Sequence, residues 1–172
     1  MDHDNLIAAC KDELQLVLGF FARVESKSSV VLAIDTGMMG FLAANAPPFS
    51  CVSRWMWLSG CPAVLLLAAS IIMLYRGSFP SLSGGQASLI YFREIAKRTE
   101  HKFVEEFSAQ TEKQHANDLL GQVWRNSQIL SAKFDFLKWA FALMAVAIPF
   151  WIITLALFAA RNARDHSTLF RP

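Results

Sequence analysis

The sequence predicts an all-α membrane protein with two or three transmembrane helices, an N-terminal amphipathic helix and a helical cytoplasmic segment between the last two spans. Three observations predict this fold class: long apolar runs, aromatic and basic residues at the ends of those runs, and helical spacing of the other apolar residues. Of the 172 residues, 54% are hydrophobic and 17% are charged, whereas soluble domains are about 25% charged. The net charge of +2 does not indicate a protein that binds nucleic acid.

Residues 1–27 are predicted to form the amphipathic helix. Apolar side chains recur at helical spacing from Leu6 to Phe21, and the acidic start does not resemble a signal peptide. Residues 28–46 follow as a first, weak transmembrane helix, because the run is only just long enough to span and holds Asp35 near its middle.

The remaining spans are clearer. Residues 47–48 are both proline and are expected to end the preceding helix, so that residues 28–75 contain the first two spans. The second span runs from about residue 55 to residue 75 and has Trp and Tyr at its ends, where amphipathic rings favour the lipid headgroups. Residues 139–160 form the last span, and residues 161–172 form a short polar tail.

Residues 76–138 are predicted to form the cytoplasmic helical segment. After a turn-rich linker, the capping-box spacing of Ser83 and Gln86 predicts that a helix begins there, with an apolar stripe from Leu89 to Phe107. The polar stretch 110–118 is expected to bend or break this helix, and a second stripe continues from Leu119 into the last span.

The distribution of Lys and Arg predicts the topology. Residues 76–138 contain nine Lys and Arg residues, whereas the 47–56 loop contains only Arg54, so the long segment is expected in the cytoplasm. With three spans the N-terminus is cytoplasmic and the tail lies outside, and with two spans both termini lie outside.

The sequence contains no recognisable catalytic constellation, and we expect no enzyme. Cys10, Cys51 and Cys61 lack the spacing of a metal site, so we expect no metal. Asp35 is a candidate intramembrane polar site. It lines a water-filled path between subunits, or pairs with Lys27, Ser28 or a neighbouring helix, or lies near the membrane interface because the first run does not span.

Two charged clusters are also candidates. Arg93, Lys97 and His101 are four residues apart and share one helix face, which suits a phosphate group. Interleaved glutamates favour the alternative of a solvated helix with ion pairs between successive turns. The second cluster is an anchor at the membrane interface, and it consists of Arg23, Glu25 and Lys27.

Four short motifs occur in a recognisable order: Arg23-Val24-Glu25-Ser26-Lys27, Ser88-Leu89-Ile90-Tyr91-Phe92, Glu105-Glu106-Phe107 and Ala132-Lys133-Phe134. In their spacing and in the layout of spans, residues 20–160 resemble the Pycsar transmembrane effector family. The family pattern usually has Asp at the position of Glu25 and an apolar residue at the position of Asp35.

The resemblance implies an antiphage defence effector in the bacterial inner membrane, with multiple spans. Such an effector responds to cyclic CMP or cyclic UMP made by a partner cyclase, needs no other cofactor, and impairs the membrane so that infection is aborted. We expect a homo-oligomer whose cytoplasmic helices bind the nucleotide. Its phosphate would meet Arg93, Lys97, Arg98 or Arg125, and its base would stack on Tyr91 or Trp124. The alternatives are a small membrane scaffold and a channel subunit that uses Asp35.

Overall fold

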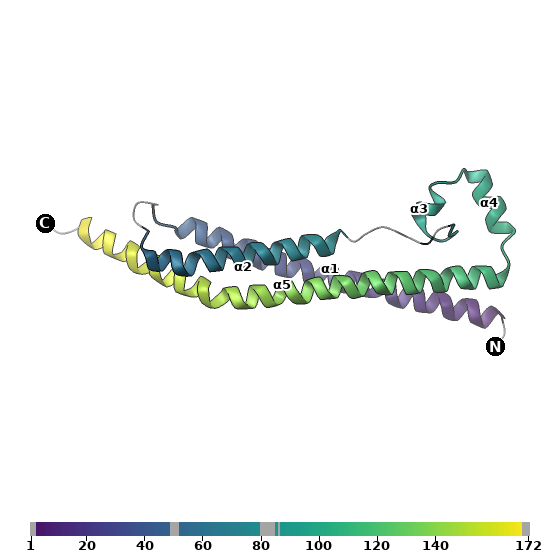
Figure 1. The fold of residues 1–172 in the computed structure, drawn as a ribbon, viewed down its shortest axis with the longest axis horizontal. Helices are drawn as coiled ribbons and strands as arrows, with labels where there is room; N and C mark the ends of the chain where they lie inside the picture. Colours follow the sequence, from purple (N-terminus) through teal and green to yellow (C-terminus); the bar gives the residue numbers. More distant parts are fainter. Residues whose placement is uncertain (1–2, 49–51, 80–84, 86, 170–172) are drawn as a thin grey trace. The chain divides into compact units, whose positions relative to one another are not determined.

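The computed structural model describes residues 3–48, 52–79, 85 and 87–169, and among them it contains helices and turns but no strand. The fold class predicted from the sequence is therefore confirmed as all-α. The helices follow one another along the chain (Figure 1). They are α1 (His3–Asn45), α2 (Arg54–Ser78), α3 (Phe92–Ile95), α4 (Glu100–Ser108) and α5 (Glu112–Leu169).

The chain divides into two compact units. The head unit comprises Met1–Glu25 and Phe79–Phe134, and the bundle unit comprises Ser26–Ser78 and Asp135–Pro172. Helices α1 and α5 each contribute residues to both units. The predicted amphipathic helix and the first apolar run are thus parts of one uninterrupted helix, α1, which ends just before the two prolines as expected.

Within the part of the chain that the structure describes, two helices are long and apolar enough to cross a membrane, namely α2 and the Glu112–Arg164 part of α5. They contain the second and last spans that the sequence predicts. Residues 28–46 belong to α1 up to its end at Asn45, and their crossing of the membrane stays a prediction.

The prediction of a helix beginning at the capping box is wrong for the residues that follow it. Ser83 and Gln86 lie outside the described residues, but residues 87–91 form turns and bends, and the first helix begins at Phe92. Ala87 has a positive φ of 63°, which is costly for a residue with a Cβ atom and interrupts a right-handed helix. The expected stripe is accordingly divided between α3 and α4, while the break at residues 109–111 agrees with the sequence.

In the bundle unit, the contacts between α1, α2 and α5 define the packing. Contacts farther along α1 meet residues farther along α5, so these two helices are parallel. Contacts farther along α2 meet residues earlier in α1 and α5, so α2 is antiparallel to both (Figure 1). Buried positions recur at spacings of three and four residues, as in coiled coils. On α2 they are Met56, Ser59, Ala63, Leu67, Ser70, Leu74 and Gly77.

Many of these buried residues are small. Ala63, Ala140 and Ala147 are completely buried, and small side chains let helix backbones approach closely where lipid tails provide no hydrophobic driving force. Gly77 marks the tightest approach among the described glycines, because a Cβ atom there would lie 3.0 Å from Phe136 Cβ. At Gly60 the corresponding Cβ would lie 3.5 Å from Thr154 Cγ2, which is an ordinary contact.

These two glycines provide a matched test of bundle packing. We expect Gly77→Ala to lower the free energy of unfolding by about 1 kcal/mol, because overpacking outweighs the gain in helix propensity. Gly60→Ala should leave the stability unchanged or raise it slightly. Thermal unfolding in detergent micelles, followed by circular dichroism, measures both changes. Equal effects at the two positions would contradict this account of the packing.

Candidate functional site

The head unit is organised around the segment of residues 87–91. Ile90 packs on a core of Cys10, Ala116 and Leu119, which come from α1 and α5. On the same side, the backbone N–H of Leu89 donates to Asp118 Oδ2 at 2.8 Å. This segment is therefore attached to α5 by apolar burial and by a charge-assisted hydrogen bond together.

Ser88 is the centre of the hydrogen bonds in this segment. Its hydroxyl oxygen accepts from the backbone N–H groups of Ile90 (3.1 Å) and Tyr91 (3.0 Å) and from Gln122 Nε2 (3.1 Å). Local bonds of this kind compete with a regular helix, which explains why α3 begins only after Tyr91. Sequence reasoning missed Asp118 and Gln122, although two polar residues four apart beside Leu119 were a visible signal.

Arg98 joins the remaining parts of the head. Its guanidinium donates to the carbonyl oxygens of Ala87 (3.0 Å), Ser88 (3.2 Å) and Glu94 (2.7 Å) and, at 2.6 Å, to Glu106 Oε2 on α4. These bonds use four of the five N–H groups of an arginine. Only 13% of the Arg98 side chain is exposed, so Arg98 holds the turn of residues 87–88 and α4 together.

The other predicted nucleotide-binding residues all lie in the head unit, but in different settings. Arg93 on α3 is exposed. Lys97 is also exposed and donates to Glu94, and this hydrogen bond lowers the pKa of the Glu94 carboxyl. Tyr91 is half-buried, and its ring contacts Phe92 at 5.1 Å.

On α5, Arg125 and Trp124 point in different directions. Arg125 is half-buried and lies three residues after Gln122, on the face of α5 that receives residues 87–91. Trp124 is 63% exposed and lies off that face. Arg125 thus shares the face of α5 from which Gln122 contacts Ser88, while Trp124 is separate.

The three residues of the predicted interface anchor have different contacts in the structure. Glu25 pairs with Lys133 at 3.2 Å, and the Lys133 ammonium also lies 5.9 Å from the ring centroid of Phe21. Arg23 lies over the ring of Phe20, on its own helix, and Lys27 is exposed. The ion pair therefore connects α1 with α5 inside the head unit.

In the bundle unit, Asp35 is completely buried between helices. Ser70 Oγ on α2 lies 2.5 Å from Asp35 Oδ2 and 3.0 Å from the carbonyl oxygen of Ala140 on α5. One hydroxyl proton cannot serve two acceptors, so both bonds form together only when the carboxyl is protonated and donates to Ser70. Asp35 Oδ1 is buried and has no hydrogen-bond partner among the described residues, which also fits a neutral carboxyl better than an ion. Of the alternatives for Asp35, the arrangement matches pairing with a neighbouring helix.

Comparison of the chain with models of protein families gives a match over most of its length. The model of the Pycsar effector protein domain matches residues 9–160, which include most of both units. The chain therefore belongs to the Pycsar effector family, as its sequence motifs indicated. Neither the curated proteins nor the solved structures gave a match.

Arg98 is expected to be structural. Arg98→Ala should lower the stability of the head by about 1–3 kcal/mol, because Glu106 and three carbonyl oxygens lose their donor. Arg98→Lys should not restore it, since an ammonium lacks the planar fork. Hydrogen exchange of residues 87–108 in detergent measures the effect, with the exposed Arg93→Ala as control. Unchanged exchange in Arg98→Ala would show that the contacts contribute nothing.

The contact between Asp35 and Ser70 leads to a further prediction. Ser70→Ala should destabilise the bundle by about 1–3 kcal/mol, because it leaves a buried carboxyl without any hydrogen bond. Asp35→Asn should be at least as stable as the natural chain, since an amide still donates to Ser70 Oγ and cannot ionise. Thermal unfolding in detergent compares the two variants. If Asp35→Asn is as damaging as Ser70→Ala, the neutral-carboxyl interpretation is wrong.

Proposed function

We propose that this protein is an antiphage effector of the bacterial inner membrane that responds to cyclic CMP or cyclic UMP, made by a partner cyclase, and impairs membrane integrity as a homo-oligomer. Infection is then aborted by death of the host cell. In this proposal the protein is a ligand-responsive membrane protein and not an enzyme. The observation that carries it is the family match over residues 9–160, which covers the helices of both units.

Two further observations support the proposal. First, α2 and α5 are apolar enough to cross a bilayer, as an effector that acts on membranes requires. Second, the positive-inside rule assigns the head unit to the cytoplasm, where a nucleotide messenger is made. The head unit also carries the basic and aromatic side chains that suit a cyclic nucleotide.

Within the head, the residues divide into two roles in our proposal. Arg93 and Lys97 are exposed and have basic groups at the surface, so they are the better candidates for the phosphate. Arg98 is mostly engaged in protein contacts, so its contribution is to hold the site together. Arg125, on the face of α5 that contacts Ser88 through Gln122, and Tyr91, at the end of the segment of residues 87–91, are candidates for the base and sugar.

In our proposal, helix α5 transmits the response to the nucleotide from the head to the membrane. Helix α5 contributes Asp118 and Gln122 to the head and Ala140 to the bundle, as a single element. A ligand that binds one arrangement of the head better than another shifts the balance between them, and α5 then carries the change to the membrane. A pore or a defect requires several copies, which is why we propose an oligomer.

Of the alternatives, the channel subunit is the less favoured. A conduction path lined by Asp35 between subunits needs that side chain on an outer face, whereas it is fully buried within the protomer. The functional test also distinguishes our proposal from a scaffold protein, because a scaffold would insert into membranes without responding to nucleotides.

Nucleotide-dependent leakage from liposomes tests the proposal. Purified full-length protein is reconstituted with a trapped dye, and cyclic CMP, cyclic UMP, cyclic AMP or no ligand is added. We expect leakage with one cyclic pyrimidine nucleotide only. Tight liposomes under every condition, with insertion verified, would overturn the direct-sensor proposal and favour the scaffold.

Variants of the head locate the messenger site. The double variant Arg93→Ala, Lys97→Ala should weaken nucleotide binding about tenfold or more in calorimetry, because two charge-assisted contacts are lost. Lys113→Ala, which removes an exposed positive charge on α5, is the matched control and should bind normally. Normal binding by the double variant would remove Arg93 and Lys97 from the site.

A further inference from the structure

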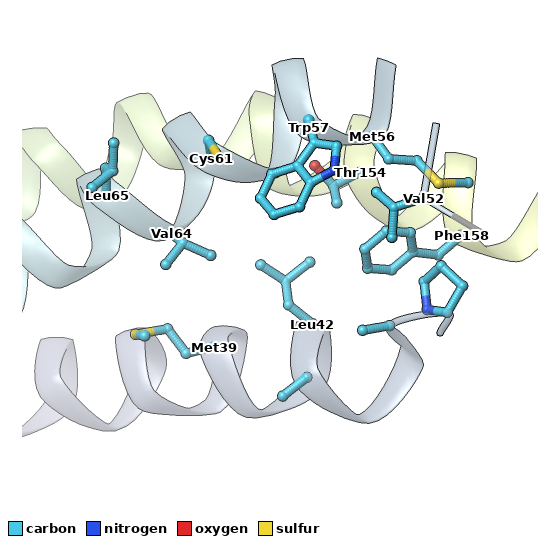
Figure 2. Close-up of a pocket in the computed structure, with 14 residues that line it drawn as sticks. Met39, Leu42, Val52, Met56, Trp57, Cys61, Val64, Leu65, Thr154 and Phe158 are labelled. Atoms are coloured by element: carbon cyan, nitrogen blue, oxygen red, sulfur yellow. The ribbon is translucent and has the colours of Figure 1, made fainter. Parts of the chain in front are cut away.

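A recess of about 500 Å³ lies between α1 and α2 in the bundle unit. Figure 2 shows Leu42 of α1 and Trp57 and Val64 of α2 bordering this space, with Phe158 and Thr154 contributed by α5. Its size is within the range of about 300–1,000 Å³ that is typical of small-molecule sites. The recess is therefore large enough to hold a ligand.

The chemistry of the lining excludes a polar ligand. Thr154 provides a hydroxyl, but its Oγ1 is already bonded to Ser59 Oγ (2.9 Å) and to the carbonyl oxygen of Phe150 (2.8 Å). The other lining side chains are apolar or weakly polar, and Leu65 at the rim is 68% exposed. Because α2 is apolar enough to cross a membrane, we expect this opening to face hydrocarbon.

Basic side chains occur at the end of the recess nearest the α1–α2 connection. Arg54 is exposed at the start of α2, three residues before Trp57 in the lining and therefore on the same helix face, and its guanidinium lies 5.7 Å from the ring centroid of Trp55. Arg161 follows one turn after Phe158, which also lines the recess. These residues lie at the end where the positive-inside rule does not call for basic charge. An apolar recess whose lining residues have arginines within one helical turn is complementary to an anionic amphiphile.

We propose that the recess binds one acyl chain of an anionic phospholipid, whose phosphate is held by Arg54 and Arg161. In a bilayer the chain gains no hydrophobic free energy by leaving its neighbours, so the recess contributes shape and dispersion contacts only. The discrimination between lipids comes from the net charge of the headgroup, because a zwitterionic lipid has the same phosphate together with a cationic group. This site is independent of the nucleotide site proposed in the head.

Native mass spectrometry of the detergent-extracted full chain tests the site, with dioleoyl phosphatidylglycerol and dioleoyl phosphatidylcholine as probes. We expect retention of the anionic lipid, and a reduction of about tenfold in Ala43→Phe, which fills the recess. Ala44→Phe is the control, because Ala44 is exposed on the same helix outside the recess. Arg54→Gln should reduce retention of phosphatidylglycerol to the level of phosphatidylcholine.

A second measurement needs no variant. Cys61 is exposed and lines the recess, whereas Cys10 is buried in the head. Phosphatidylglycerol should slow alkylation of Cys61 by N-ethylmaleimide about tenfold relative to phosphatidylcholine, as followed by peptide mass spectrometry. Equal retention and equal protection by the two lipids would overturn the proposal. So would a lipid-free dimer in which a second copy protects Cys61.

Discussion

Asp35 carries a carboxyl group into the interior of a helical bundle where every other polar group must also find a partner inside the protein. Its hydrogen bond to Ser70, and the contact of Ser70 with Ala140, connect three helices at one level. A second polar contact, Thr154 Oγ1 with Ser59 Oγ, fixes α5 against α2 nearer the start of α2. Two such points determine the register of these helices, and the small residues between them can then pack closely.

In the head, too, polar groups find their hydrogen-bond partners within the protein. Residues 87–91 have no regular structure of their own, so their backbone polar groups are satisfied by Asp118, Ser88 and Arg98. The motifs that indicated the family occupy these contacts. Glu25 meets Lys133, and Arg98 bridges the carbonyl of Ser88 to Glu106. The short motifs of the family thus correspond to tertiary contacts that hold helices together.

The sequence was sufficient for features that depend on local composition. The two clear spans, the end of α1 before its prolines and the break before α5 follow from apolar runs, prolines and polar stretches. The irregular course of residues 87–91 did not follow, because it depends on Gln122, thirty-four residues from Ser88. For Arg98, both a phosphate and an ion pair were compatible with the pattern. The partner at Ala87, eleven residues earlier, became evident only in the fold.

The indole of Trp151 provides a way to observe changes in the packing of the bundle. Its Nε1 donates to the carbonyl oxygen of Met38 at 3.0 Å, and its ring contacts Phe41 at 6.0 Å. Separation of α1 from α5 would break this bond and change the surroundings of one indole, which makes intrinsic fluorescence a label-free reporter of the bundle's state. Its surroundings differ from those of the other four tryptophans, which are more than half exposed: Trp55, Trp57, Trp124 and Trp139.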